Sequence, residues 1–266
     1  MYFDCDTRIG RSAGTKNLGG HDISPETLLA NMDRIGVEKA LVFHTMAWEY
    51  HPNEGNAMLM EALAPHRDRL EPCWVMLPHH TGEVPHPQDT VAEMQRLGVK
   101  AARIFPNFPA NSHRFELAEW CIGEMLGALE AARIPLLLDF VLFRREQPPF
   151  RDIFSICENH PELPVILIGV QARNNRSLYP LLRRFPNLHV QTAGYFVHRG
   201  LEHFTEFFGS RQLVFGSNTP TLGMGAAHFH VDRALVAETD RTAIAGSNLT
   251  ALLAAAAERA QQEGRI

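Results

Sequence analysis

The sequence lacks the features that mark several classes of protein. Its 266 residues include only four cysteines, which lie far apart and form no CxxC pair. Reduced, buried thiols fit this pattern better than disulfides or a zinc knuckle. No apolar run approaches the roughly 20 residues of a membrane span, and the N-terminus shows no basic region followed by an apolar stretch and a cleavage site. We therefore expect a cytoplasmic protein with no membrane partner.

An excess of positive charge is also missing. The chain has 25 Lys and Arg against 30 Asp and Glu, and its basic residues form no continuous run. Nucleic acid is therefore not an expected partner. A Gly-rich phosphate loop is absent as well: residues 10–20 contain glycines without a dinucleotide fingerprint, and they lead into Ser24, which we predict to cap a helix.

What the chain does contain is one repeated rhythm. Short apolar or β-branched segments alternate with segments whose apolar residues recur at a spacing of three and four, which is typical of strands alternating with helices. The predicted strands cover residues 2–6, 39–44, 70–77, 99–105, 134–140, 163–169, 188–193 and 212–217. Eight such units in a chain of this size, with no linker or shift in composition, predict a single (β/α)8 barrel domain over residues 1–266.

Polar residues cluster where these strands end, which in such a barrel is the end that carries chemistry. The segment "FDCDTRIG" (3–10) is the clearest case. By the two-residue period of a strand, Asp4, Asp6 and Arg8 fall on one face. They either line an active site or form a charge-compensated structural group.

Four segments in order along the chain carry a resemblance. They are "GVKAARIFP" (98–106), "FPNLHVQTAG" (185–194), "LVFGSNTP" (213–220) and "RTAIAGSNLTALL" (241–253). Together with "FDCDTRIG", which stands where D-x-H-x-H would stand, they resemble the amidohydrolase-related family of metal-dependent hydrolases and decarboxylases. The resemblance spans the whole chain and implies a barrel enzyme.

The usual metal ligands of that family are replaced. The resemblance implies two His on the first strand, a His after a middle strand and an Asp after the eighth strand. Here these positions read Asp6 and Arg8, then Gly169 or Val170, and finally Asn218. A guanidinium cannot ligate a cation and stays charged near neutral pH, so Arg8 would repel a divalent ion. We therefore expect neither a metal nor another cofactor.

The first interpretation is a metal-independent enzyme that acts on a small carboxylate-bearing substrate, with a cyclic one among the options. The reaction is either hydrolysis of a lactone or ester or a decarboxylation. Proton transfer needs a titratable group with a tuned pKa, and arginines at strand ends suit an anion or a developing oxyanion. The candidates for acid and base are Asp4, Asp6, His44, His80 and Asp139. The candidates for substrate binding are Arg8, Arg103, Arg173, Tyr195 and Asn218; for Asn218 we expect a hydrogen bond to the substrate or to Asp6.

Two other interpretations stay open. Asp4, Asp6 and Asp139 with His44 or His80 would make an oxygen-rich site for magnesium or manganese, against which Arg8 counts. Alternatively, the barrel has lost catalysis and serves in binding or assembly, with Asp6 and Arg8 neutralising each other in the old pocket. The apolar segment 251–260 packs either on its own barrel or on a second copy, so a homo-oligomer is a further possibility.

Overall fold

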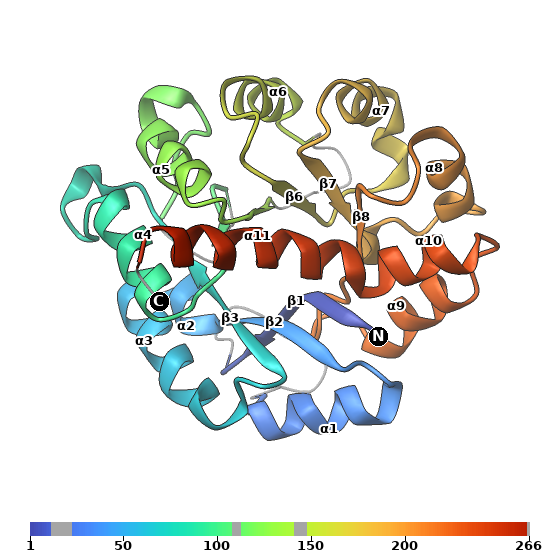
Figure 1. Ribbon diagram of the computed structural model, residues 1–266, viewed down its shortest axis with the longest axis horizontal. Helices are drawn as coiled ribbons and strands as arrows, with labels where there is room; N and C mark the ends of the chain where they lie inside the picture. The colour runs from blue at the N-terminus through green and yellow to red at the C-terminus, as the bar shows by residue number, and fades with distance from the viewer. Residues whose placement is uncertain (12–22, 108–112, 141–147, 265–266) are drawn as a thin grey trace.

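The computed structural model describes residues 1–11, 23–107, 113–140 and 148–264 (Figure 1). Eight parallel strands form one sheet in the order in which they occur along the chain. They are β1 (Phe3–Ile9), β2 (Lys39–His44), β3 (Leu70–Val75), β4 (Ala101–Ile104), β5 (Leu136–Asp139), β6 (Val165–Ile168), β7 (Leu188–Gln191) and β8 (Leu213–Val214).

Backbone hydrogen bonds between β1 and the segment that follows β8 close the sheet into a barrel. The Cys5 N–H donates to the Phe215 carbonyl over 2.9 Å, and the Arg8 N–H donates to the Thr219 carbonyl over 3.1 Å. The Thr219 N–H in turn donates to the Asp6 carbonyl over 3.2 Å. The predicted (β/α)8 barrel is confirmed.

Helices surround the barrel and follow the strands in turn (Figure 1). They are α1 (Pro25–Ile35), α2 (Thr45–Glu49), α3 (Pro52–Leu63), α4 (Pro87–Arg96), α5 (Glu119–Ala131), α6 (Phe150–Asn159), α7 (Asn175–Arg184), α8 (Gly200–Phe208), α9 (Met224–Asp232), α10 (Glu238–Thr242) and α11 (Asn248–Gln262). The predicted cap of α1 is confirmed, since the Ser24 hydroxyl accepts the Thr27 N–H over 3.2 Å. No helix of the described ranges is long and apolar enough to cross a membrane.

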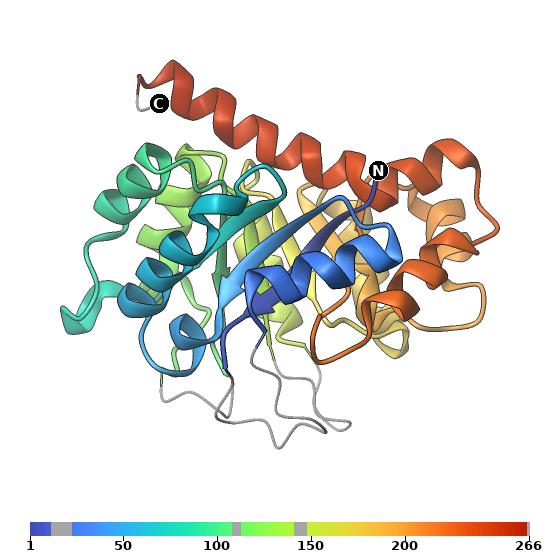
Figure 2. The same cartoon turned by 90° about the horizontal axis from the view of Figure 1, so that it is seen from below.

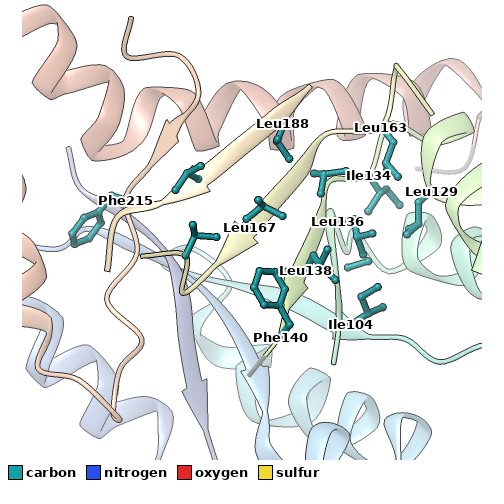
Figure 3. Packing of buried hydrophobic residues seen from close by; sticks show 14 of the residues in the cluster. Ile104, Leu129, Ile134, Leu136, Leu138, Phe140, Leu163, Leu167, Leu188 and Phe215 are labelled. Atoms are coloured by element: carbon teal, nitrogen blue, oxygen red, sulfur yellow. The ribbon is translucent and has the colours of Figure 1, made fainter. Parts of the chain in front are cut away.

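The apolar core has two layers, which follow from the alternation of side chains along each strand. Along β5, Leu136 and Leu138 pack outward against the helices, whereas Leu137 faces the barrel interior. Figure 3 shows part of the outer layer, where Leu136 and Leu138 lie with Ile104 of β4 and Leu129 of α5. Because Asp139 is two residues beyond Leu137, it shares the interior face.

Helix α11 lies across the end of the barrel where the strands begin (Figure 2). Leu249 and Leu253 belong to the interior cluster, and Ala256 and Ala260 are buried as well. Of the two placements expected for residues 251–260, the structure shows packing on the chain's own barrel. The opposite end, where the strands end and where barrels of this kind carry their active sites, is here called the mouth.

One strand departs from regular alternation. Between Asp4 and Thr7, three steps of β1 match only two steps of β2, which is the signature of a β-bulge. Phe3 and Cys5 face the interior before the bulge, whereas Ile9 packs in the outer layer after it. The bulge therefore turns the side chains of residues 6 and 8 inward, and the prediction that Asp4 shares their face is wrong.

Candidate active site

A layer of hydrogen-bonded polar side chains lies on top of the apolar interior, at the mouth. Its centre is Arg103 of β4, whose side chain is 3% exposed. Its Nη1 donates to Oδ1 of Asp6 over 2.7 Å, and its Nη2 donates to Oδ2 of Asp139. One guanidinium thus joins the carboxylates of β1 and β5 in a geometry that satisfies both.

Gln191 of β7 extends this layer across the barrel. Its Nε2 donates to the second carboxylate oxygen of Asp6 over 2.8 Å, and its Oε1 accepts the Gly169 N–H over 3.2 Å. The segment after β8 leaves space for the Gln191 side chain only because residue 216 is glycine. A Cβ there would lie 2.6 Å from Cγ and 2.7 Å from Nε2 of Gln191.

Both aromatic and ionic contacts hold Arg103 in place. Its guanidinium carbon lies 4.4 Å from the ring centre of Phe43 and 5.1 Å from that of Phe105. Burial alone would lower the pKa of Arg103, but Asp6 and Asp139 raise it above the usual value. The group is therefore a fixed positive charge at every accessible pH.

Asp139 is the most accessible member of the layer. Its side chain is 15% exposed, against 2% for Asp6 and 3% for Arg103. Burial raises the pKa of Asp139 to about 6, with Arg103 opposing the rise and Asp6 adding to it. A carboxyl group with this pKa exchanges protons near neutral pH, as a general acid or base must.

Asp4 lies outside this layer and holds the bulge of β1. Its Oδ1 accepts the N–H groups of Asp6 and Ser217 over 3.0 and 2.9 Å, while its Oδ2 is buried and has no hydrogen-bond partner. Burial raises the pKa of Asp4 to about 7. The contacts indicate a structural carboxyl group that ties β1 to the segment after β8.

Arg8 is the second arginine of the interior face. Its guanidinium carbon lies 5.3 Å from the ring centre of Trp48 in α2, which itself stacks on Phe105 at 5.5 Å. No ion pair joins Arg8 to any described acid, and its buried Nη2 has no hydrogen-bond partner. Burial lowers the pKa of Arg8, and Asp6 opposes this shift. The expected neutralisation of Arg8 by Asp6 is wrong, because Asp6 pairs with Arg103 instead.

His44 is buried at the end of β2 beside these residues. Its Nδ1 accepts the Met46 N–H over 3.1 Å and so caps α2, the helix that carries Trp48. Gly10, with φ of +87°, packs directly against the imidazole: a Cβ at this position would lie 2.7 Å from Nε2. His44 therefore positions α2 at the mouth.

The described side chains at the mouth do not fit a divalent cation. Both oxygens of Asp6 and one oxygen of Asp139 already accept hydrogen bonds, and the Arg103 guanidinium occupies the space between the two carboxylates. A hard cation needs several oxygens converging on one point with no competing charge. The oxygen-rich metal site is therefore not supported, since Asp4 also turns away and is engaged by two N–H groups.

Besides Asp4, the structure leaves four of the predicted residues outside this layer. His80 is exposed, and its Nε2 lies 2.8 Å from the Cys121 carbonyl of α5. Arg173 is exposed and lines a hollow on the outside of the barrel with Arg176 and Tyr179.

Tyr195 and Asn218 complete this group. Tyr195 is fully buried in the outer layer, where its hydroxyl donates to Oδ1 of Asn175 over 2.8 Å. Asn218 adopts a left-handed backbone with φ of +55°, a conformation that Asn tolerates better than most residues. Of the two partners expected for Asn218, Asp6 binds Arg103 and Gln191 and makes no hydrogen bond with Asn218, whereas a bond to the substrate stays a prediction.

Gln191 of the layer and Trp48 beside it are not among the predicted site residues. Gln191 lies within the predicted strand 188–193 and ends β7, but an amide two positions from an apolar residue is common in any strand. Trp48 follows β2 on a five-residue helix that periodicity cannot detect. The need for glycine at position 216 points to Gln191, but this need is visible only once the two residues are seen side by side in the structure.

Neither a family model nor a curated protein matches the sequence, but solved structures match its fold over nearly the whole chain. The 2,6-dihydroxybenzoate decarboxylase from Rhizobium has a TM-score of 0.69 at 17% identity, covering 95% of this chain and 98% of its own. The 5-carboxyvanillate decarboxylase from Novosphingobium aromaticivorans, in complex with manganese and a nitrobenzoic acid, has a TM-score of 0.72 at 12% identity, covering 96% of each chain.

A third structure connects the fold with the resemblance seen in the sequence. A Staphylococcus aureus protein, provisionally assigned as an amidohydrolase, has a TM-score of 0.69 at 12% identity, covering 95% of this chain and 99% of its own. The resemblance to amidohydrolase-related barrels is thus confirmed at the level of the fold.

Proposed function

We propose that this protein is an enzyme that decarboxylates a small, ring-bearing carboxylic acid without a divalent metal ion. The observation that carries the proposal is the position of Arg103. Its guanidinium supplies the positive charge between Asp6 and Asp139, which leaves the Nη2 group of Arg8 to bind an anion and the partly exposed Asp139 carboxyl to exchange a proton. The fold supports the choice of reaction, since two of its structural neighbours are decarboxylases of aromatic acids.

Substrate binding would use Arg8 and Trp48. A buried guanidinium with an unpartnered N–H forms a strong, charge-assisted bond with a carboxylate or phenolate. The indole of Trp48 lies against the same guanidinium, and the Phe105 ring stacks on the indole, so aromatic rings border the place proposed for the anion. An acidic substrate that itself carries a ring suits these surroundings.

The proton would come from Asp139. In its acid form, this carboxyl donates a proton to the carbon that bears the substrate carboxylate. The bond from that carbon to the carboxyl carbon then breaks, its electron pair stays on the ring, and CO2 leaves. Asp139 recovers its proton from water. A pKa of about 6 leaves a useful fraction of the acid form near neutral pH.

Hydrolysis of a lactone or ester is the second candidate, and the same free N–H of Arg8 favours it. A cationic donor at this place would stabilise the oxyanion formed when water attacks a carbonyl, with ionised Asp139 as the base. The two reactions differ in the form of Asp139 that they need and in whether CO2 is released.

The test is a screen of dihydroxybenzoates, carboxyvanillate and lactones with and without a chelator. We expect turnover that survives chelation and a KM raised tenfold or more in Arg8→Ala. Arg173→Ala is the matched control, because Arg173 lies outside the layer, and its kinetics should equal those of the wild type. Activity that chelation abolishes and manganese restores would refute the proposal. An absence of turnover on all these substrates would favour the non-catalytic interpretation.

A further inference from the structure

A second group of ligand-type side chains comes from the connection before α4 and from α5. These two helices are neighbours on the outside of the barrel (Figure 1). His79 belongs to a 3-10 turn, η2 (His79–Thr81), that follows β3. His86 directly precedes α4, and Glu124 lies in the second turn of α5. None of the three takes part in the polar layer at the mouth.

The three side chains converge on one point. Nε2 of His86 lies 3.0 Å and Nε2 of His79 lies 3.5 Å from the same oxygen, Oε2 of Glu124. All three ligand atoms fall within 4.8 Å of one another. In a tetrahedral zinc site with bonds of about 2.0–2.1 Å, neighbouring ligand atoms are about 3.3 Å apart. The two distances from the histidine nitrogens to Oε2 of Glu124, 3.0 and 3.5 Å, lie on either side of this value.

The surrounding chain holds this arrangement in place. His86 stands between Pro85 and Pro87, and its extended backbone (φ of −57°, ψ of 144°) is the one that a following proline favours. The turn η2 is fastened to α5 by the contact of His80 with the Cys121 carbonyl. Little ordering would therefore be needed when an ion binds.

We propose that His79, His86 and Glu124 form a zinc-binding site that fastens the β3–α4 connection to α5. Two imidazoles and one carboxylate are a donor set that zinc prefers, and the partial exposure of all three leaves a fourth position for water. A pair of ordinary surface hydrogen bonds would not require both Nε2 atoms to face one oxygen. None of these residues takes part in the polar layer around Arg103, so the ion would stabilise the protein without entering the reaction.

The test is a titration of the full chain, prepared without an affinity tag, with ZnCl2 by calorimetry. We expect one equivalent to bind with a Kd in the micromolar range or below, and zinc to raise the Tm. Single variants His86→Ala and Glu124→Gln should each weaken this equivalent at least tenfold and abolish the rise in Tm. Glu124→Gln keeps the size of the side chain, so it guards against misfolding.

The matched control is His203→Ala, which removes an exposed imidazole that lies 3.8 Å from Glu206 on α8. This variant should bind zinc as the wild type does. Failure of the wild type to bind zinc below millimolar concentration would overturn the proposal. So would a bound equivalent that persists unchanged in both His86→Ala and Glu124→Gln.

Discussion

At the scale of single residues, the pKa of Asp139 decides how the proposed reaction depends on pH. Decarboxylation needs the acid form, so kcat should fall as the pH rises through about 6. Asp139→Asn should lower kcat by about 10²- to 10⁴-fold and remove this dependence, while the protein stays folded because the amide oxygen still accepts from Arg103. Steady-state kinetics between pH 5 and 8 would check both. An unchanged profile in Asp139→Asn would assign the proton to another group.

A second residue-scale prediction concerns Asp4 and stability. Burial raises its pKa from the ordinary 3.8 to about 7 in the folded chain, so the folded state binds more protons between these two pH values. The free energy of unfolding should therefore fall as the pH rises from about 4 to 7. Asp4→Asn removes the buried charge and keeps the oxygen that accepts two N–H groups.

Urea denaturation at pH 5 and pH 8 measures this effect. The wild type should lose stability between the two values, with Asp139 contributing in the same direction. In Asp4→Asn the loss should be smaller by an amount on the order of 1–3 kcal/mol. An equal loss in both proteins would mean that Asp4 is ionised throughout.

At the scale of elements, the close approach of β7 and the segment after β8 depends on Gly216. In Gly216→Ala the new methyl group would meet Gln191 and also the Cys5 sulfur, which it would approach to 2.9 Å. We expect a loss of about 1–3 kcal/mol and a displaced Gln191 that no longer binds Asp6. Denaturant melts would show the first effect and a crystal structure the second.

Gly127→Ala is the control for that substitution. Gly127 lies inside α5, and a Cβ there meets nothing within 4 Å. The same added methyl group should therefore stabilise the protein by about 0.5–1 kcal/mol. A destabilised Gly127→Ala would show that helix propensity is not what separates the two sites.

The sequence predicts the elements well and the contacts of the site only in part. Each of the eight predicted strands overlaps a strand of the structure, because buried parallel strands are continuous apolar runs. The prediction for residues 39–44 has the same bounds as β2. The faces of β1 were misjudged because one extra residue shifts the alternation, and no local pattern announces a bulge. The ion-pair partner of Asp6 could not be predicted either. Asp6 pairs with Arg103, 97 residues away in the sequence, and not with Arg8 in its own strand.

At the scale of the whole molecule, the two ends of the barrel are covered differently. Helix α11 lies across the end opposite the mouth (Figure 2), and its Leu253 is buried in the interior cluster. Leu253→Ala should cost about 2–5 kcal/mol in stability and leave KM and kcat unchanged at a temperature where the variant is folded. Glu258→Ala, an exposed position on the same helix, should change stability by no more than about 0.5 kcal/mol.

Chemical denaturation and steady-state kinetics on the same preparations would compare the two variants. A drop in kcat that matches the loss of stability would indicate that the closed end supports the mouth directly. Equal stabilities would show that α11 adds little to the barrel.

The guanidinium between Asp6 and Asp139 has a consequence for the cell that makes the protein. Unlike a bound metal ion, a positive charge on a side chain of β4 does not depend on the metal supply. It cannot be removed by a chelator or replaced by a different metal. It arrives with translation, in fixed stoichiometry, and is ready when the chain has folded. The charge is also permanent: a change in ion supply does not alter it, and only a mutation of Arg103 would.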